Sequence, residues 1–134
     1  MANHKIPDIG VHHLALLTAD FNQSIKFYTE GLGFKVIIEW GEGPKRAAML
    51  DIGNGSHFEI FACETLEEEK NARFTHFAFA TSNVDLAYEN AIKAGAVPRN
   101  EPKSLEIPSN PPVPIRIAFV LGPDGEVLEF FQML

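Results

Sequence analysis

Cysteines and long apolar runs are scarce in this sequence, and each scarcity excludes a class of protein. The 134 residues include one cysteine, Cys63, which excludes an internal disulfide framework and a cysteine-rich zinc module. No stretch approaches the ~20 apolar residues of a membrane-spanning helix. The N-terminus also lacks a basic patch followed by an apolar segment. We therefore expect a soluble, cytoplasmic protein with no membrane partner.

Basic residues are also few, since 11 Lys and Arg stand against 18 Asp and Glu, for a net charge of -7. An acidic chain has no broad positive field to attract a phosphate backbone, so we expect no nucleic-acid partner. Apolar residues are plentiful at 46%, but 10 glycines and 9 prolines interrupt them. Such frequent interruptions exclude a long helical bundle, and the length suits a single domain.

The first half predicts the order strand, helix, strand, strand, strand. Residues 11–18 form a short apolar run typical of a buried strand, and Asp20 then resembles an N-cap, with Gln23 as its capping-box partner. Asn54-Gly55 is the strongest hairpin signal in the chain. The helix face consists of Phe21, Ile25, Tyr28 and Leu32, with Gly31 and Gly33 as the stop, and the three later strands are expected at 34–40, 46–52 and 55–62.

The second half repeats this order after a charged stretch, 64–73, which we interpret as a solvated connector. A strand is expected at 74–81, followed by a helix with Ser82 as its N-cap. The segment 98–114 holds six of the nine prolines, so we expect a stiff loop or a plain surface connection there, and no central strand. The remaining predictions are a helix face of Val84, Tyr88 and Ala91 ending at Gly95, strands at 115–121 and 126–134, and a turn at Pro123-Asp124-Gly125.

The two halves match residue by residue at specific positions. His13-Leu-Ala-Leu corresponds to His76-Phe-Ala-Phe, 76 minus 13 or 63 residues later, and Glu59 corresponds to Glu129, 129 minus 59 or 70 residues later. The pattern predicts an α+β fold built from two βαβββ modules. We expect one domain over 1–134, with modules at about 9–63 and 74–132.

Each module contributes one His in its first strand and one Glu in its last. If a pseudo-twofold axis relates the modules, the four side chains converge on one point. Two imidazoles and two carboxylates suit a divalent transition metal, and a carboxylate in an apolar strand is costly unless it is paired or coordinated. We therefore predict a metal site formed by His13, Glu59, His76 and Glu129.

Several motifs in the expected order resemble the vicinal oxygen chelate superfamily, which includes glyoxalase I, fosfomycin resistance proteins, methylmalonyl-CoA epimerase, extradiol dioxygenases and bleomycin resistance proteins. The resemblance spans about 9–132, and the motifs are His13-Leu-Ala-Leu, SIKFYTEGLGF at 24–34, Phe58-Glu59-Ile60, Thr75-His76-Phe-Ala-Phe and GPDGEVLE at 122–129. It implies a U-shaped half-barrel sheet with the metal inside, bidentate chelation of a small-molecule substrate, and a homodimer. Zn or Ni is the favoured metal, with Co, Mn and Fe as alternatives.

The four-ligand pattern is most similar to metal-dependent glyoxalase I, in which the Glu of the last strand is also the proton-transferring base. This makes Glu129 the first candidate for the base and Glu59 the second. The chain has Leu17, Cys63 and Ala72 where glyoxalase I is expected to have polar anchors for glutathione. A different thiol adduct, a fosfomycin thiol transferase or epimerase reaction, and non-catalytic drug binding similar to bleomycin resistance proteins are the alternatives.

Alternation along the strands places three more residues near the predicted site. His57 shares a strand face with Glu59 and is a candidate to support a metal ligand from behind or to act as a proton shuttle. Phe61 lies two residues after Glu59 and Phe131 two residues after Glu129, and both are candidate pocket residues. His12 faces away from His13 and is expected to be structural. Cys63 is given no catalytic role.

Overall fold

The computed structural model describes residues 2–31, 33–63, 73–122 and 125–134. It divides into an N-terminal unit, residues 13–75 and 108–111, and a C-terminal unit, residues 1–12, 76–107 and 112–134. Most of the predicted connector, together with Leu32 and the Pro123-Asp124 part of the predicted turn, lies outside the described residues.

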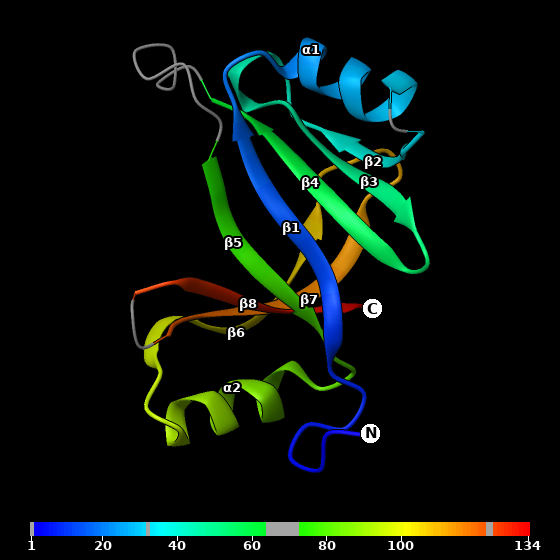
Figure 1. Ribbon diagram of the computed structural model, residues 1–134. Coiled ribbons are helices and arrows are strands. Elements are labelled where there is room, and N and C mark those ends of the chain that lie inside the picture. Colours follow the sequence, from blue (N-terminus) through cyan, green and yellow to red (C-terminus); the bar gives the residue numbers. More distant parts are fainter. Residues whose placement is uncertain (1, 32, 64–72, 123–124) are drawn as a thin grey trace. The chain divides into compact units, whose positions relative to one another are not determined.

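The N-terminal unit contains most of one βαβββ module (Figure 1). Its strands lie in the order β2-β3-β4-β1. β4 runs parallel to β1, and β3 is antiparallel to both β2 and β4. The elements are β1 (Gly10–Thr18), α1 (Phe21–Lys26), the π-helical turn η1 (Phe27–Gly31), β2 (Lys35–Trp40), the 3-10 turn η2 (Gly43–Lys45), β3 (Ala47–Gly53) and β4 (Ser56–Ala62).

Two local signals in this unit are confirmed. The Asp20 side chain caps α1 by accepting a 3.0 Å hydrogen bond from the Gln23 backbone N–H. Asn54 and Gly55 both have positive φ, 55° and 79°, as a tight two-residue hairpin requires. This turn sets the register of β3 against β4 and so determines which face of β4 carries Glu59.

The C-terminal unit has the same topology, with strands in the order β5-β8-β7-β6. β8 is parallel to β5, and β7 is antiparallel to both β8 and β6. The elements, coloured from green to red in Figure 1, are β5 (Arg73–Ala80), α2 (Val84–Lys93), β6 (Val97–Ile107), β7 (Val113–Leu121) and β8 (Val127–Met133).

The predicted N-cap of α2, Ser82, is wrong by one residue. Asn83 is the cap, and its side chain accepts a 3.0 Å hydrogen bond from the Leu86 backbone N–H. The backbone N–H of Ser82 instead donates to Asp8 at 3.2 Å. Both residue types are good caps, so the sequence pattern alone did not distinguish them.

The proline-rich segment 98–114 is also corrected, because much of it is strand. β6 pairs with β7, and its register shifts twice between Pro98 and Lys103. β6 is the terminal strand of its sheet order, where proline is tolerated because one edge needs no ladder donor. The prediction that this segment forms no central strand is confirmed. The prediction of a loop is wrong, because β6 occupies much of the segment.

Each unit buries one apolar face of its helix against its own strands. Phe21 of α1 packs with Leu50 and Ile60 in one core cluster, and Val84 and Ala87 of α2 pack with Val120 in the other. Ile25, Tyr28 and Ala91, which the helical periodicity predicted to face inward, contact these clusters. Among the described residues, no helix is long and apolar enough to cross a membrane.

Candidate functional site

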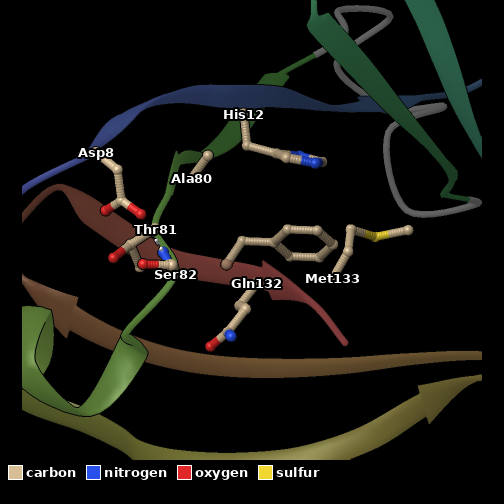
Figure 2. Close-up of a pocket in the computed structure, with 8 residues that line it drawn as sticks. Asp8, His12, Ala80, Thr81, Ser82, Gln132 and Met133 are labelled. Atoms are coloured by element: carbon tan, nitrogen blue, oxygen red, sulfur yellow. Dashed lines mark hydrogen bonds between the residues drawn. The ribbon is translucent and has the colours of Figure 1, made fainter.

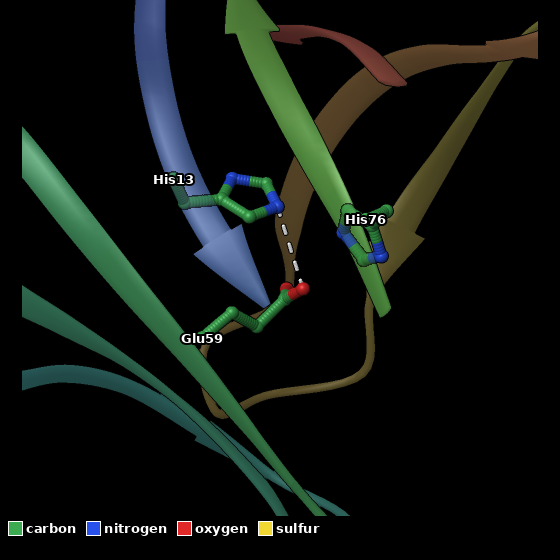
Figure 3. A group of neighbouring side chains, drawn as sticks. All are labelled: His13, Glu59 and His76. Atoms are coloured by element: carbon green, nitrogen blue, oxygen red, sulfur yellow. Dashed lines mark ion pairs between the residues drawn. The ribbon is translucent and has the colours of Figure 1, made fainter. Parts of the chain in front are cut away.

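A buried His–Glu pair lies between β1 and β4 in the N-terminal unit. His13 is fully buried and Glu59 is 7% exposed, and His13 Nε2 lies 3.4 Å from Glu59 Oε1, the ion pair drawn dashed in Figure 3. The parallel register places Ala15 opposite Glu59, so His13 lies diagonally across the strand pair. Long side chains can meet across such a diagonal, and the small Ala15 side chain leaves room for the contact.

The C-terminal unit contains an equivalent pair between β5 and β8. His76 Nε2 lies 3.0 Å from Glu129 Oε2, and Glu129 is 4% exposed. Ala78 is opposite Glu129, so His76 again occupies the diagonal position. The repeated residues found in the sequence therefore correspond to a repeated geometry, with an alanine in the gap each time.

These residues suit a metal ion chemically. Burial of a carboxylate costs free energy unless a partner or a cation offsets its charge, and both glutamates are buried beside an imidazole. His13, Glu59 and His76, labelled in Figure 3, each offer a ligand atom of a type that divalent metals bind, an imidazole nitrogen or a carboxylate oxygen.

The antiparallel neighbour of each Glu is a large apolar residue that was not predicted from the sequence to lie near the site. Met49 is opposite Glu59 and fully buried, and Phe119 is opposite Glu129. The Phe119 ring also meets the His76 ring edge to face, with centroids 5.5 Å apart. A phenylalanine inside an apolar strand carries no sequence signal beyond core packing, so only the register identifies this contact.

The predicted neighbours of the site have other described contacts. His57 is half-buried and lies opposite His13 in the β1–β4 register. Phe61 packs edge to face on Trp40, at 6.0 Å between ring centroids. Phe131 is buried and lies against His12 at 4.2 Å.

Two residues expected to have no catalytic role are placed as follows. His12 is half-buried, and its ring is tilted by 38° against Phe131. Cys63 follows β4 and is partly exposed, and its backbone N–H donates a 2.9 Å hydrogen bond to the Thr18 carbonyl. This bond continues the contact between β1 and β4 beyond the end of the strand pair.

A family model described as the glyoxalase/bleomycin resistance protein/dioxygenase superfamily matches residues 10–130. The chain belongs to this superfamily. YwkD, an uncharacterized protein of Bacillus subtilis (strain 168), is 30% identical over 129 residues, covering 92% of this chain and 96% of YwkD. A probable lactoylglutathione lyase of Vibrio cholerae (serotype O1, strain El Tor Inaba N16961) is 24% identical over 138 residues, covering 98% of this chain and 93% of the relative.

A solved structure of methylmalonyl-CoA epimerase from Mycobacterium tuberculosis shares the fold with a TM-score of 0.73. It is 17% identical, and the match covers 100% of this chain and 93% of the epimerase. The superfamily resemblance and the predicted α+β fold are thereby confirmed. The domain boundaries, the homodimer, the cytoplasmic location and the absence of a nucleic-acid partner stay predictions.

Proposed function

We propose that this superfamily member is a divalent-metal-dependent enzyme of the glyoxalase I type. One observation carries the proposal: a buried His–Glu pair with the same diagonal register occurs once in each unit. A single buried pair is often structural. Two pairs at equivalent positions of an internal repeat favour a shared function over two unrelated structural contacts.

In this proposal, His13, Glu59, His76 and Glu129 are the protein ligands of one divalent metal ion, with zinc or nickel favoured. Two carboxylates offset the charge of the cation, and two imidazoles suit zinc, nickel, cobalt and iron. A metal ion bound there supplies Lewis-acid stabilisation of negative charge that develops on a substrate oxygen. This stabilisation lowers the barrier to removing a proton from the neighbouring carbon.

Glu129 is the proposed base, and Glu59 is the second candidate. The Glu129 carboxylate takes the proton from the substrate carbon next to the carbonyl, and the electron pair of the broken C–H bond moves toward the carbonyl oxygen. Returning the proton to the adjacent carbon, while the hydroxyl proton of the hemithioacetal passes to the former carbonyl oxygen, converts the hemithioacetal of a 2-oxoaldehyde into a hydroxyacyl thioester. No redox partner is consumed, because one carbon is oxidised while its neighbour is reduced.

Replacement of Glu129 by Gln tests this proposal. We expect purified protein to carry about one divalent metal ion per chain. We expect Glu129→Gln to abolish isomerisation of the adduct of methylglyoxal and glutathione, because an amide cannot accept the proton. Turnover is followed by thioester absorbance, and metal content by elemental analysis.

The matched control is Glu89→Gln, an exposed carboxylate on α2, which should keep wild-type activity. Circular dichroism verifies that both variants fold. A protein that binds no divalent metal contradicts the proposal and favours the non-catalytic, drug-binding alternative.

A second candidate, epimerisation of an acyl-CoA thioester, is favoured by the fold likeness to methylmalonyl-CoA epimerase. Both reactions remove a proton next to a carbonyl, so Glu129 has the same role in each. Leu17 and Cys63 stand at two of the positions where glutathione anchors were expected, which also leaves room for another thiol. Deuterium uptake from heavy water into methylmalonyl-CoA, without turnover of the glutathione adduct, identifies the epimerase.

A further inference from the structure

A hollow of about 340 Å³ opens in the C-terminal unit, and its lining residues include none of the four proposed metal ligands. Its wall is built from Asp8 and His12 near the start of β1, from the end of β5, and from the end of β8. Small-molecule sites typically enclose about 300–1,000 Å³. This volume therefore fits a small ligand, and the hollow is open to solvent, since Asp8, Ser82 and Met133 are exposed.

One end of the hollow is polar. Figure 2 shows the side chains of Asp8, Thr81 and Ser82 gathered there. The Ser82 backbone N–H donates to Asp8 Oδ2 at 3.2 Å and so fixes the carboxylate against the end of β5. Asp8 has a φ of 64°, a left-handed conformation that is uncommon for residues other than glycine. Asp is one of the residue types that tolerate this conformation, and the bond from Ser82 orients the exposed carboxylate toward the hollow.

The other end is aromatic and apolar. The His12 ring lies against Phe131, with centroids 4.2 Å apart, and Phe131 is 2% exposed. Met133 is 50% exposed, and Figure 2 shows His12 and Met133 away from the Asp8 end. A fixed aromatic ring and a flexible thioether favour contact with an alkyl or aryl group.

The charge of the lining residues selects the ligand. Among the described residues that line the hollow, Asp8 is the acidic one, His12 is the other titratable one, and none is Lys or Arg. An ammonium group has three hydrogen-bond donors and no acceptor, which suits the Asp8 carboxylate and the hydroxyl oxygens of Thr81 and Ser82. An anionic ligand would be repelled by Asp8 and by the net charge of -7.

We propose that this hollow binds a small organic amine in its protonated form. The ammonium group contacts Asp8, Thr81 and Ser82, and a short hydrocarbon chain lies against Phe131 and Met133. The site is separate from the proposed metal chemistry and does not rest on it.

Titration of the ¹⁵N-labelled full chain with butylammonium chloride tests the site, with butyrate and butan-1-ol as probes of the same length. We expect saturable shifts of the backbone amide signals of Asp8, Thr81, Ser82 and Met133 with butylammonium. Butan-1-ol should bind about two- to fivefold more weakly, since it lacks the ionic hydrogen bond to the exposed Asp8 carboxylate, and butyrate should give no saturable shift. Equal binding of butyrate overturns the proposal.

Two variants test the hollow, one at each end. Asp8→Asn should weaken butylammonium binding by about two- to fivefold, the range of an exposed ion pair, while Glu101→Gln, an exposed charge change on β6 of the same unit, leaves it unchanged. Met133→Ala should weaken butylammonium more than methylammonium, which has no chain to contact the thioether. Unchanged binding by Asp8→Asn, or equal losses in Asp8→Asn and Glu101→Gln, shows non-specific charge attraction and rejects the site.

Discussion

At the scale of single residues, two alanines explain how each His reaches its Glu. Ala15 and Ala78 are both fully buried and lie opposite Glu59 and Glu129 in their parallel strand pairs. A larger side chain at either position would occupy the space across which the imidazole and carboxylate meet. The motif is therefore better described as His-x-Ala on the first strand facing Glu on the last.

Phe119 is expected to be a positioning residue for His76. Its ring meets the imidazole edge to face, so Phe119→Leu removes a surface that contacts the proposed ligand. We expect metal affinity to fall by about tenfold, as is typical when a group that supports a metal ligand is removed. Isothermal titration with zinc or nickel measures the change.

Phe79→Leu is the control, since Phe79 stacks on Phe130 in the helix-facing core. It should lower thermal stability without changing metal affinity. Equal metal affinity in wild type and Phe119→Leu would assign Phe119 a purely packing role.

At the scale of elements, α2 is attached to the sheet by its first turn. Asn83 caps the helix, and Arg116 of β7 donates two 2.6 Å hydrogen bonds to the Asp85 carboxylate, from Nε and from a terminal guanidinium nitrogen. The other terminal nitrogen donates to Ser104 of β6 at 3.1 Å. One arginine thereby links α2, β7 and β6.

The corrected N-cap has a measurable consequence. Asn83→Ala should lower the free energy of unfolding by about 1 kcal/mol, the usual cost of losing a side-chain cap. Ser82→Ala should change it by less, because the bond from Ser82 to Asp8 comes from the backbone N–H and survives the substitution. Urea denaturation of the two variants decides between the two cap assignments. A larger loss of unfolding free energy in Ser82→Ala than in Asn83→Ala would support Ser82 as the cap.

The Asp85–Arg116 pair predicts a pH dependence. Hydrogen bonds from Arg116 lower the pKa of the Asp85 carboxyl from its ordinary 3.8, outweighing the opposing effect of burial. The folded pKa is below the unfolded value, so the pair stabilises the fold fully above pH 3.8 and loses this contribution as pH falls through the folded pKa.

We therefore expect Asp85→Asn to be less stable than wild type at neutral pH. This deficit should shrink as pH falls from 3.8 through the lower folded pKa, below which the wild-type carboxyl is also protonated. The effect is small because the Asp85 side chain is 53% exposed. Urea midpoints of both proteins across this pH range provide the measurement, and a pH-independent difference would rule out the pair as its source.

At the scale of the whole molecule, the two modules are proposed to be a single folding unit. Each covers roughly sixty residues, and a chain of that size rarely buries enough apolar surface to be stable alone. The sole tryptophan, Trp40, lies in β2 of the N-terminal unit and reports on that unit by fluorescence. A perturbation of the other core therefore tests cooperativity.

Val120→Ala truncates a fully buried side chain in the C-terminal core. The substitution should lower the free energy of unfolding by about 2 kcal/mol. If folding is cooperative, Trp40 fluorescence and far-ultraviolet circular dichroism will show the same lowered urea midpoint. A Trp40 midpoint that stays at the wild-type value, with an earlier dichroism transition, means that the units unfold separately.

The sequence by itself determined most of the element order, and it proposed the residues of the site. Strand alternation, the Asp20 cap and the Asn54-Gly55 turn are local signals, because each depends on a few neighbouring residues. The repeat then related His13 to His76 and Glu59 to Glu129 without any knowledge of pairing. The Asp20 cap and the Asn54-Gly55 turn are confirmed because each depends on a short stretch of chain, whereas the metal-ligand roles of the repeated residues stay predictions.

Only the tertiary structure decided the features that depend on which strands are neighbours. β6 forms despite its prolines because it lies at the end of its sheet order, and a terminal strand can spare backbone donors on its outer edge. Phe119 meets His76 because antiparallel pairing aligns β7 with β8. The parallel pairing of β5 with β8 joins residues far apart in sequence, and no local pattern encodes it.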